Sequence, residues 1–205
     1  MLGTAAVAMW WDMAPDMRAE FEDWHSHEHM PERLAIPGFL RGTRWAATSG
    51  EPSYFVLYEA ADLATLTGGA YVARLNDPTP WSRKMMPHHR NMVRSLCRVG
   101  ASFGHGVAQV TATVRLDQPL AAQALSPLPQ RRGLTLACLL ESHSLEGMPQ
   151  TAEQRIRGRD AEAAWVALVG GYDADAVGAA AKRVADPAAV RLYRLSYSLC
   201  SEDVA

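Results

Sequence analysis

The first half of the chain alternates between apolar, strand-like runs and runs of helical composition. The apolar run over residues 4–12 predicts a strand, and Ala14-Pro15-Asp16 after it predicts a helix start with an acidic first turn. We expect this helix to end near His29, because Pro31 disfavours helical geometry at Met30. The other elements expected here are strands over 39–48 and 54–60 joined as a hairpin, a helix over 62–75 and a strand over 92–99.

The second half begins with the clearest alternation in the sequence. Residues 108–116 place apolar and polar side chains on opposite faces, which predicts a half-buried strand. Pro119, Pro127 and Pro129 interrupt the next stretch, and a proline inside a helix costs ~3 kcal/mol, so at most one or two helical turns fit there. The other elements expected are strands over 134–142, 163–170 and 190–199 and a helix over 173–184.

Both halves therefore follow the order βαββαβ, the ferredoxin-like plan of a four-stranded antiparallel sheet with two helices on one face. The bare sheet faces of two such repeats can cover each other, which predicts an α+β fold with a barrel-like sandwich inside one chain. The repeats are residues 1–100 and 106–205, joined by the flexible run GASFGHG. An open sheet that pairs with a separate dimer partner is the alternative.

Composition and charge exclude several classes of protein. With 205 residues, 48% hydrophobic and 20% charged, the chain can bury enough apolar surface to fold. A net charge of -2 leaves no broad positive field, so nucleic acid is not an expected partner. The apolar residues 2–11 are far short of the ~20 that a membrane span needs. Three scattered cysteines indicate reduced thiols and a cytoplasmic location.

One motif carries a resemblance to a known superfamily. Residues 24–45 combine an aromatic residue, a histidine-containing helix end, Pro-Glu-Arg and then Pro-Gly before an aromatic-rich strand, and residues 75–86 continue the pattern. Over roughly residues 4–99 the chain resembles the dimeric α+β barrel superfamily, with EthD-like proteins as the nearest match. The resemblance implies two tandem ferredoxin-like repeats forming an intrachain dimeric α+β barrel, with a cavity between helices and sheet. It implies no single reaction, because the superfamily includes cofactor-free monooxygenases, lactone isomerases and haem enzymes.

The run HSHEH contains the densest titratable cluster in the chain. A histidine pKa near 6.5 makes such groups usable as acid or base, so His25 and His29 are the candidate catalytic pair, with Glu28 to orient one imidazole. At i and i+4 the two histidines share a helix face, while His27 points elsewhere. At a helix end His29 would be protonated. The alternative is that all are structural polar groups, and the spacing fits no known zinc motif.

Aromatic and basic residues nearby are candidates for substrate binding. Arg44 and Arg41 lie on opposite faces of their strand, so one of them can anchor an acidic ligand in a cavity. Aromatic residues can line a pocket for an aromatic substrate, although they serve more often as core packing. Residues 87–90, with two histidines, are interpreted as a solvated helix end. The candidate substrate-binding residues are Trp24, Arg44, Trp45, Tyr58 and Trp81.

These observations predict an enzyme without a cofactor that uses histidine acid/base chemistry on a small apolar or aromatic substrate, as an isomerase, decarboxylase or monooxygenase. No glycine-rich nucleotide motif is present. Only the first half is equipped for a site, because five of the seven histidines precede residue 100. The alternatives are a non-catalytic ligand-binding or structural protein and a haem protein with His143 as axial ligand. The expected partners are a small-molecule ligand and a second copy of the chain in a homodimer.

Overall fold

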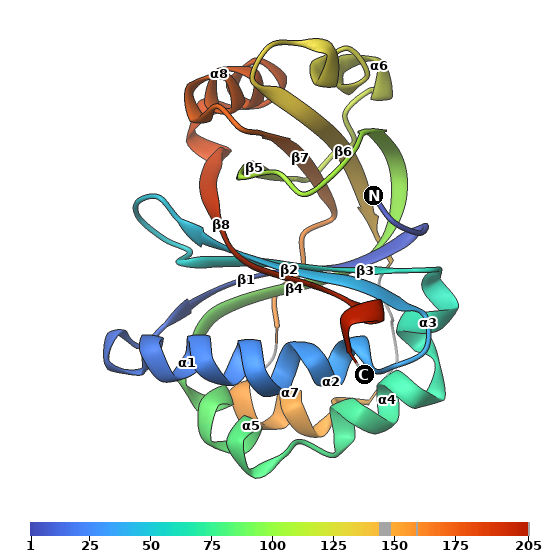
Figure 1. Ribbon diagram of the computed structural model, residues 1–205, viewed down its shortest axis with the longest axis vertical. Coiled ribbons are helices and arrows are strands. Elements are labelled where there is room, and N and C mark those ends of the chain that lie inside the picture. Colours follow the sequence, from blue (N-terminus) through green and yellow to red (C-terminus); the bar gives the residue numbers. More distant parts are fainter. Residues whose placement is uncertain (144–148, 159, 205) are drawn as a thin grey trace.

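The computed structural model describes residues 1–143, 149–158 and 160–204, and its eight strands form one closed antiparallel barrel (Figure 1). The predicted α+β class and the predicted barrel are confirmed. Around the barrel the order is β1-β3-β2-β8-β5-β7-β6-β4, so the pairs β2–β8 and β4–β6 join the two halves. The strands are β1 Ala5–Met13, β2 Phe39–Ala47, β3 Tyr54–Ala60, β4 His89–Gly104, β5 Val110–Leu116, β6 Leu134–Ser142, β7 Trp165–Gly171 and β8 Arg191–Cys200.

The strands of the first half are buried on both faces. Along β1, Val7 and Trp11 pack toward the helices, whereas Ala8 and Trp10 pack inside the barrel. A strand covered on both sides reads as a continuous apolar run, which is why this half of the sequence alternates so weakly.

The prediction of a half-buried strand over residues 108–116 holds at Gln109 and Arg115, which are exposed, and is wrong at two of its polar positions. Thr111 and Thr113 of β5 are buried, because the sheet of the first half covers their face. The indole N–H of Trp10 donates to the Thr113 hydroxyl at 3.1 Å. Hydrogen bonds across the barrel interior thus supply partners for some of the polar side chains on this face.

Helices cover the barrel on two opposite sides (Figure 1). The helices α1, α2, α4, α5 and α7 lie beneath the sheet formed by β1–β4, and α6 and α8 lie above the other four strands. The helices are α1 Arg18–Trp24, a π-helix His25–His29, α2 Met30–Leu34, α3 Leu63–Thr67, α4 Gly69–Asn76, α5 Pro80–Met85, α6 Ala122–Leu125, α7 Ala152–Arg157 and α8 Ala174–Val184. Short 3-10 turns are Pro15–Met17, Met86–His88, Leu128–Gln130, Pro187–Ala189 and Ser201–Asp203.

Three hydrophobic clusters follow from this layering. One lies between the β1–β4 sheet and the lower helices, one fills the barrel interior, and one lies beneath α6 and α8. The first contains most of the large aromatic side chains, including Trp11, Phe21 and Tyr58. The aromatic residues of the first half are therefore divided between the helical side of the sheet and the barrel interior.

Three segments differ from the expectation. The helix predicted over 62–75 is two helices, α3 and α4, because Gly68 between them is extended. The predicted joint over 100–106 is mostly strand, since β4 continues to Gly104 and pairs there with β6. Helix α7, orange in Figure 1, was not predicted and joins the lower helical layer although it follows β6 in the sequence.

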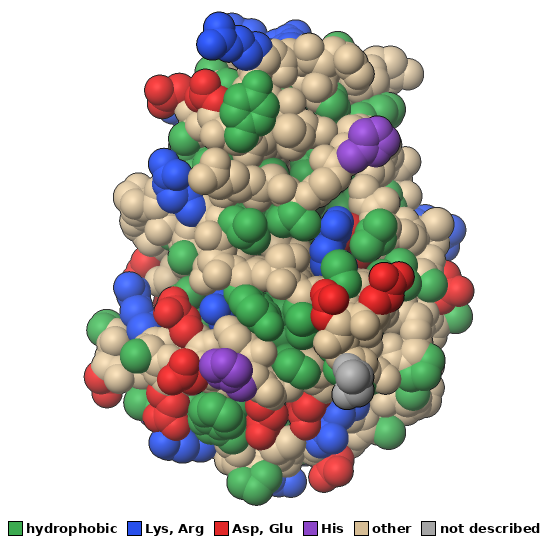
Figure 2. All heavy atoms as spheres, in the orientation of Figure 1, with side chains coloured by type: hydrophobic (Ala, Val, Ile, Leu, Met, Phe, Trp, Pro, Cys, Tyr) green, Lys and Arg blue, Asp and Glu red, His purple; other side chains and the backbone are tan. Residues whose placement is uncertain are grey.

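The surface carries mixed charge. Figure 2 shows acidic and basic side chains interspersed over one face, with no large patch of a single sign. Across the part of the chain that the structure describes, every helix falls short of the length and apolar character needed to cross a membrane.

Candidate functional site

The HSHEH run is itself a π-helix inside a continuous helical segment from Arg18 to Leu34. The N–H of Met30 donates to the carbonyl of His25, five residues back. In an α-helix Pro31 would clash with the carbonyl of residue 27, and the wider π-turn accommodates the proline without ending the helix. The expectation that the helix ends near His29 is therefore wrong.

The wide turn places His25 and His29 together beneath the sheet. Both side chains are buried, at 2% and 8% exposure, and their ring centroids are 5.6 Å apart. The Tyr58 hydroxyl lies 3.3 Å from Nε2 of His25, and the Trp24 ring lies 4.4 Å from that of His29. His27 is exposed, with Nδ1 3.0 Å from the Asp23 carbonyl.

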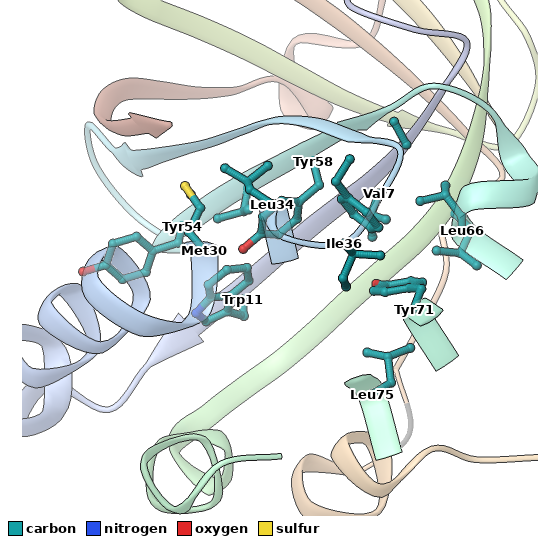
Figure 3. Packing of buried hydrophobic residues seen from close by; sticks show 14 of the residues in the cluster. Val7, Trp11, Met30, Leu34, Ile36, Tyr54, Tyr58, Leu66, Tyr71 and Leu75 are labelled. Atoms are coloured by element: carbon teal, nitrogen blue, oxygen red, sulfur yellow. The ribbon is translucent and has the colours of Figure 1, made fainter. Parts of the chain in front are cut away.

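These rings line a small cavity of about 30 Å³ between the sheet and the helices. Figure 3 shows Trp11 of β1 and Tyr58 of β3 reaching from the sheet into this layer. His89, at the start of β4, lines the same cavity, so the interpretation of residues 87–90 as a solvated helix end is wrong for His89.

Two hollows of about 560 Å³ each adjoin the cavity. One shares Leu75 and Arg94 with its lining, and the other shares His89, Met92 and Arg157. These five side chains form the walls between the cavity and the larger neighbouring space. Because the cavity is only about 30 Å³, a ligand larger than a few atoms fits against the histidines only if one of these walls moves.

Four buried nitrogen atoms in the cavity lining have no hydrogen-bond partner among the described residues. They are Trp11 Nε1, His25 Nδ1, His29 Nδ1 and Arg33 Nη1. Leaving a buried polar group unpaired costs about 1–3 kcal/mol, and native structures contain few such groups. A polar molecule in the cavity, whether water or ligand, would supply the partners that these atoms lack.

The electrostatics keep both imidazoles neutral. Burial lowers the pKa of His25 well below its usual value, and the charge of Arg44 adds to the effect. Burial, followed by the charge of Arg33, likewise lowers the pKa of His29. The predicted protonated His29 at a helix end is thus wrong, because the helix does not end there. Burial also raises the pKa of Tyr58, which keeps its hydroxyl protonated.

Helix α7 from the second half completes the site. Glu153 forms a buried ion pair with Arg33 and lies 3.5 Å from Arg157, which pairs in turn with Asp160 at 2.7 Å. Glu153 and Arg157 both line the cavity. The expectation that only the first half is equipped for a site is therefore wrong, since two charged lining residues come from beyond residue 150.

Glu28 and Trp81 lie away from the cavity. The carboxylate of Glu28 accepts hydrogen bonds from the Trp24 indole at 3.2 Å and from the Thr79 hydroxyl, not from a histidine. The Trp81 indole donates to Glu20 at 3.2 Å. Of the predicted site residues Glu28, Trp24 and Trp81, only Trp24 lines the cavity. Glu28 instead links the π-helix to the start of α5.

Arg44 and Trp45 face opposite sides of β2. Trp45 lies in the barrel interior, stacked on Phe55 at 5.3 Å, with its indole donating to the Ala108 carbonyl at 3.0 Å. The Arg44 guanidinium packs over the ring of Phe21 on the helical side. Phe21 in turn packs against His25 at 5.4 Å. Arg44 therefore acts on the cavity through its charge and Trp45 lies outside it.

Sequence reasoning missed several lining residues, notably Trp11, Arg33, His89, Glu153 and Arg157. Arg33 belongs to the Pro-Glu-Arg motif, which was a usable signal. Glu153 lies 120 positions from Arg33 and gave none. In the described residues no group of three or more His, Cys, Asp or Glu side chains is arranged to hold a metal ion.

Comparisons with known proteins show which solved structures have a similar fold. No protein-family model and no curated protein sequence matches the chain. Among solved structures, an anthrone oxidase-like protein is similar, with a TM-score of 0.60 and 11% identity over 98% of this chain and 94% of its own. A protein of Lactobacillus acidophilus NCFM provisionally named a monooxygenase has a TM-score of 0.57 at 8% identity, covering 97% of each chain.

A third similar structure is provisionally named a chlorite dismutase. It has a TM-score of 0.54 at 10% identity and covers 100% of this chain and 98% of its own. At such low identity these likenesses concern the fold alone, and the closer resemblance to EthD-like proteins stays a prediction. Together with the closed barrel, they show that the protein has the dimeric α+β barrel fold.

Proposed function

We propose that the protein is an enzyme without a cofactor in which His25 and His29 exchange protons with a small-molecule substrate. The observation that carries the proposal is the pair of buried Nδ1 atoms that lack partners among the described residues and line one cavity. An imidazole kept neutral by burial holds an unprotonated nitrogen that can accept a proton at neutral pH. Trp24 and Tyr58 position the two rings.

The charges around the cavity favour proton removal from the substrate. Arg33, Arg94 and Arg157 line it against the single carboxylate of Glu153. Their excess positive charge stabilises a substrate that becomes negative when a histidine takes its proton. The reaction types that begin in this way include isomerisation, and oxidation by dioxygen of a carbanion-forming aromatic compound.

The size of the cavity limits how a substrate is seated. An engineered cavity of about 150 Å³ in another protein holds benzene, so about 30 Å³ is too small for an aromatic ring. The reacting edge of the substrate would occupy the cavity while its body lies in an adjoining hollow. Met92, a flexible side chain in the wall toward one hollow, is placed to move aside.

Anthrone is the first substrate to test, because the similar structure with a TM-score of 0.60 is an anthrone oxidase-like protein. The balanced reaction is anthrone plus dioxygen giving anthraquinone plus water, in which the base removes a ring C–H proton and dioxygen is reduced. Oxygen uptake and anthraquinone absorbance measure turnover. We expect His25→Gln and His29→Gln to lower kcat at least 100-fold, in the range that a general base contributes.

His27→Gln, on the exposed side of the same helix, is the matched control and should retain turnover. Turnover unchanged in both cavity variants would exclude histidine catalysis. If no small aromatic acid, lactone, quinone or anthrone turns over, and the cavity variants mainly lower stability, the protein is instead a non-catalytic binding or structural protein.

Two further assignments complete the proposal. Both halves have the strand order fourth, first, third, second, seen as β4-β1-β3-β2 and β8-β5-β7-β6, which supports two tandem ferredoxin-like repeats over residues 1–100 and 106–205. The second repeat has only α6 and one 3-10 turn in its first helix position. A cytoplasmic location and a further pairing of two chains stay predictions.

A further inference from the structure

The unpaired atoms of the cavity share a chemical character. Nη1 of Arg33 and Nε1 of Trp11 can only donate hydrogen bonds. The Tyr58 hydroxyl is hydrogen-bonded to Nε2 of His25, which leaves Nδ1 of that ring to face the cavity. Two of the four unpaired atoms therefore can only offer hydrogens, and a partner that satisfies them must present acceptors.

The charge of the lining agrees with this donor excess. Three arginines, Arg33, Arg94 and Arg157, line the cavity with one carboxylate, Glu153. Asp160 pairs with Arg157 from outside the lining and still leaves one positive charge uncompensated. A buried positive excess is costly in the empty site, and an anion that enters removes the cost.

We infer that the cavity binds its ligand through an anionic oxygen, such as a carboxylate, phenolate or enolate, held by Arg33 Nη1 and Trp11 Nε1. Glu153 holds the other side of the Arg33 guanidinium and so positions it. This inference deepens the proposed function, because it names the substrate class of the same cavity. Its test involves no turnover, so a site that binds anions without catalysis would contradict only the proposed function.

The test uses formate and formamide, which have the same shape and differ in charge. Each is titrated into 15N-labelled protein in chloride-free HEPES buffer at pH 7.5, and the Trp11 indole N–H resonance, assigned with Trp11→Phe, reports occupancy. We expect formate to bind at least 10-fold more tightly than formamide and to shift the Trp11 resonance with saturation. Equal affinities for the two probes would overturn the inference.

Two substitutions should act in opposite directions. Arg33→Met should weaken formate binding at least 10-fold, whereas Glu153→Gln, which removes the competing carboxylate, should tighten it. A merely structural role would weaken binding in both variants, and that result would contradict the inference. Arg183→Gln, at an exposed position of α8, removes the same charge as Arg33→Met and should leave formate binding unchanged. If Arg33→Met does not fold, the sign of the Glu153→Gln effect still decides.

Discussion

The buried neutral histidines should make the protein less stable as pH falls below neutrality. Burial lowers the pKa of His25 and of His29 well below 6.5 in the folded protein. In the unfolded chain the pKa of each histidine returns to about 6.5, so the unfolded chain binds protons that the folded chain does not bind. Stability from these groups is fully present above pH 6.5 and is lost as pH decreases from 6.5 toward the folded pKa.

The magnitude follows from proton linkage. Between pH 7.5 and pH 5.5, each histidine that stays neutral when folded and has an unfolded pKa of 6.5 lowers the unfolding free energy by about 1.4 kcal/mol. His25 and His29 together therefore account for about 3 kcal/mol of acid sensitivity. That amount is a large part of the 5–15 kcal/mol by which a typical domain is stable.

Urea unfolding at the two pH values, followed by tryptophan fluorescence, measures this loss directly. His25→Gln and His29→Gln cannot titrate, so each should reduce the loss by about 1.4 kcal/mol relative to the unsubstituted protein. Carboxylates and His89 are present in every variant, so their contribution to the stability loss cancels when the variants are compared. His27→Gln should show the full loss. If the two cavity variants lose as much stability as the unsubstituted protein, the histidines are not buried in neutral form.

Three other outcomes test the site. Glu153→Ala should cost about 3–5 kcal/mol in urea unfolding, because it leaves Arg33 buried without its carboxylate, and Glu153→Ala with Arg33→Met should recover most of that loss. Gly42→Ala should cost about 1–3 kcal/mol, since the added Cβ would lie 2.9 Å from Cε1 of Tyr58 and Cγ of Met30; Gly69→Ala, whose Cβ would meet nothing within 4 Å, is the control for thermal unfolding. If anthrone is turned over, kcat should stay within twofold between pH 8 and pH 5.5, because burial lowers the pKa of the base, whereas a histidine of ordinary pKa would be about nine-tenths protonated at pH 5.5 and would lose about tenfold in kcat.

The barrel was predictable from the sequence because its signals are local. Apolar runs such as residues 4–12 and 54–60 identify strands that are covered on both faces, and the turn over residues 49–52 identifies a hairpin. Residues 108–116 show where local pattern fails. Threonines at alternate positions indicate a solvated face, but the opposing sheet buries them, and a period of two does not distinguish a polar interior from water.

The candidate site was predictable only in part, because half of it depends on long-range contacts. His25 and His29 are neighbours on one helix, so spacing alone brings them together. Glu153 and Arg157, by contrast, have the spacing of an ordinary exposed ion pair on a short helix. Their burial follows from the position of α7, which lies beneath the β1–β4 sheet with the helices of the first half. No local pattern encodes that position.

The π-turn connects the proline that misled the sequence reading to the chemistry of the cavity. A proline at position 31 would normally end the helix near His29, where exposed carbonyls would favour a charged ring. The chain instead widens one turn, continues through Met30, and buries both imidazoles beneath Trp11 and Tyr58. Wide turns of this kind are uncommon and occur often at functional sites, because they reorient side chains at the cost of regular hydrogen bonding. The same local irregularity thus keeps the histidines neutral and directs them into one cavity, and a regular helix ending at His29 would do neither.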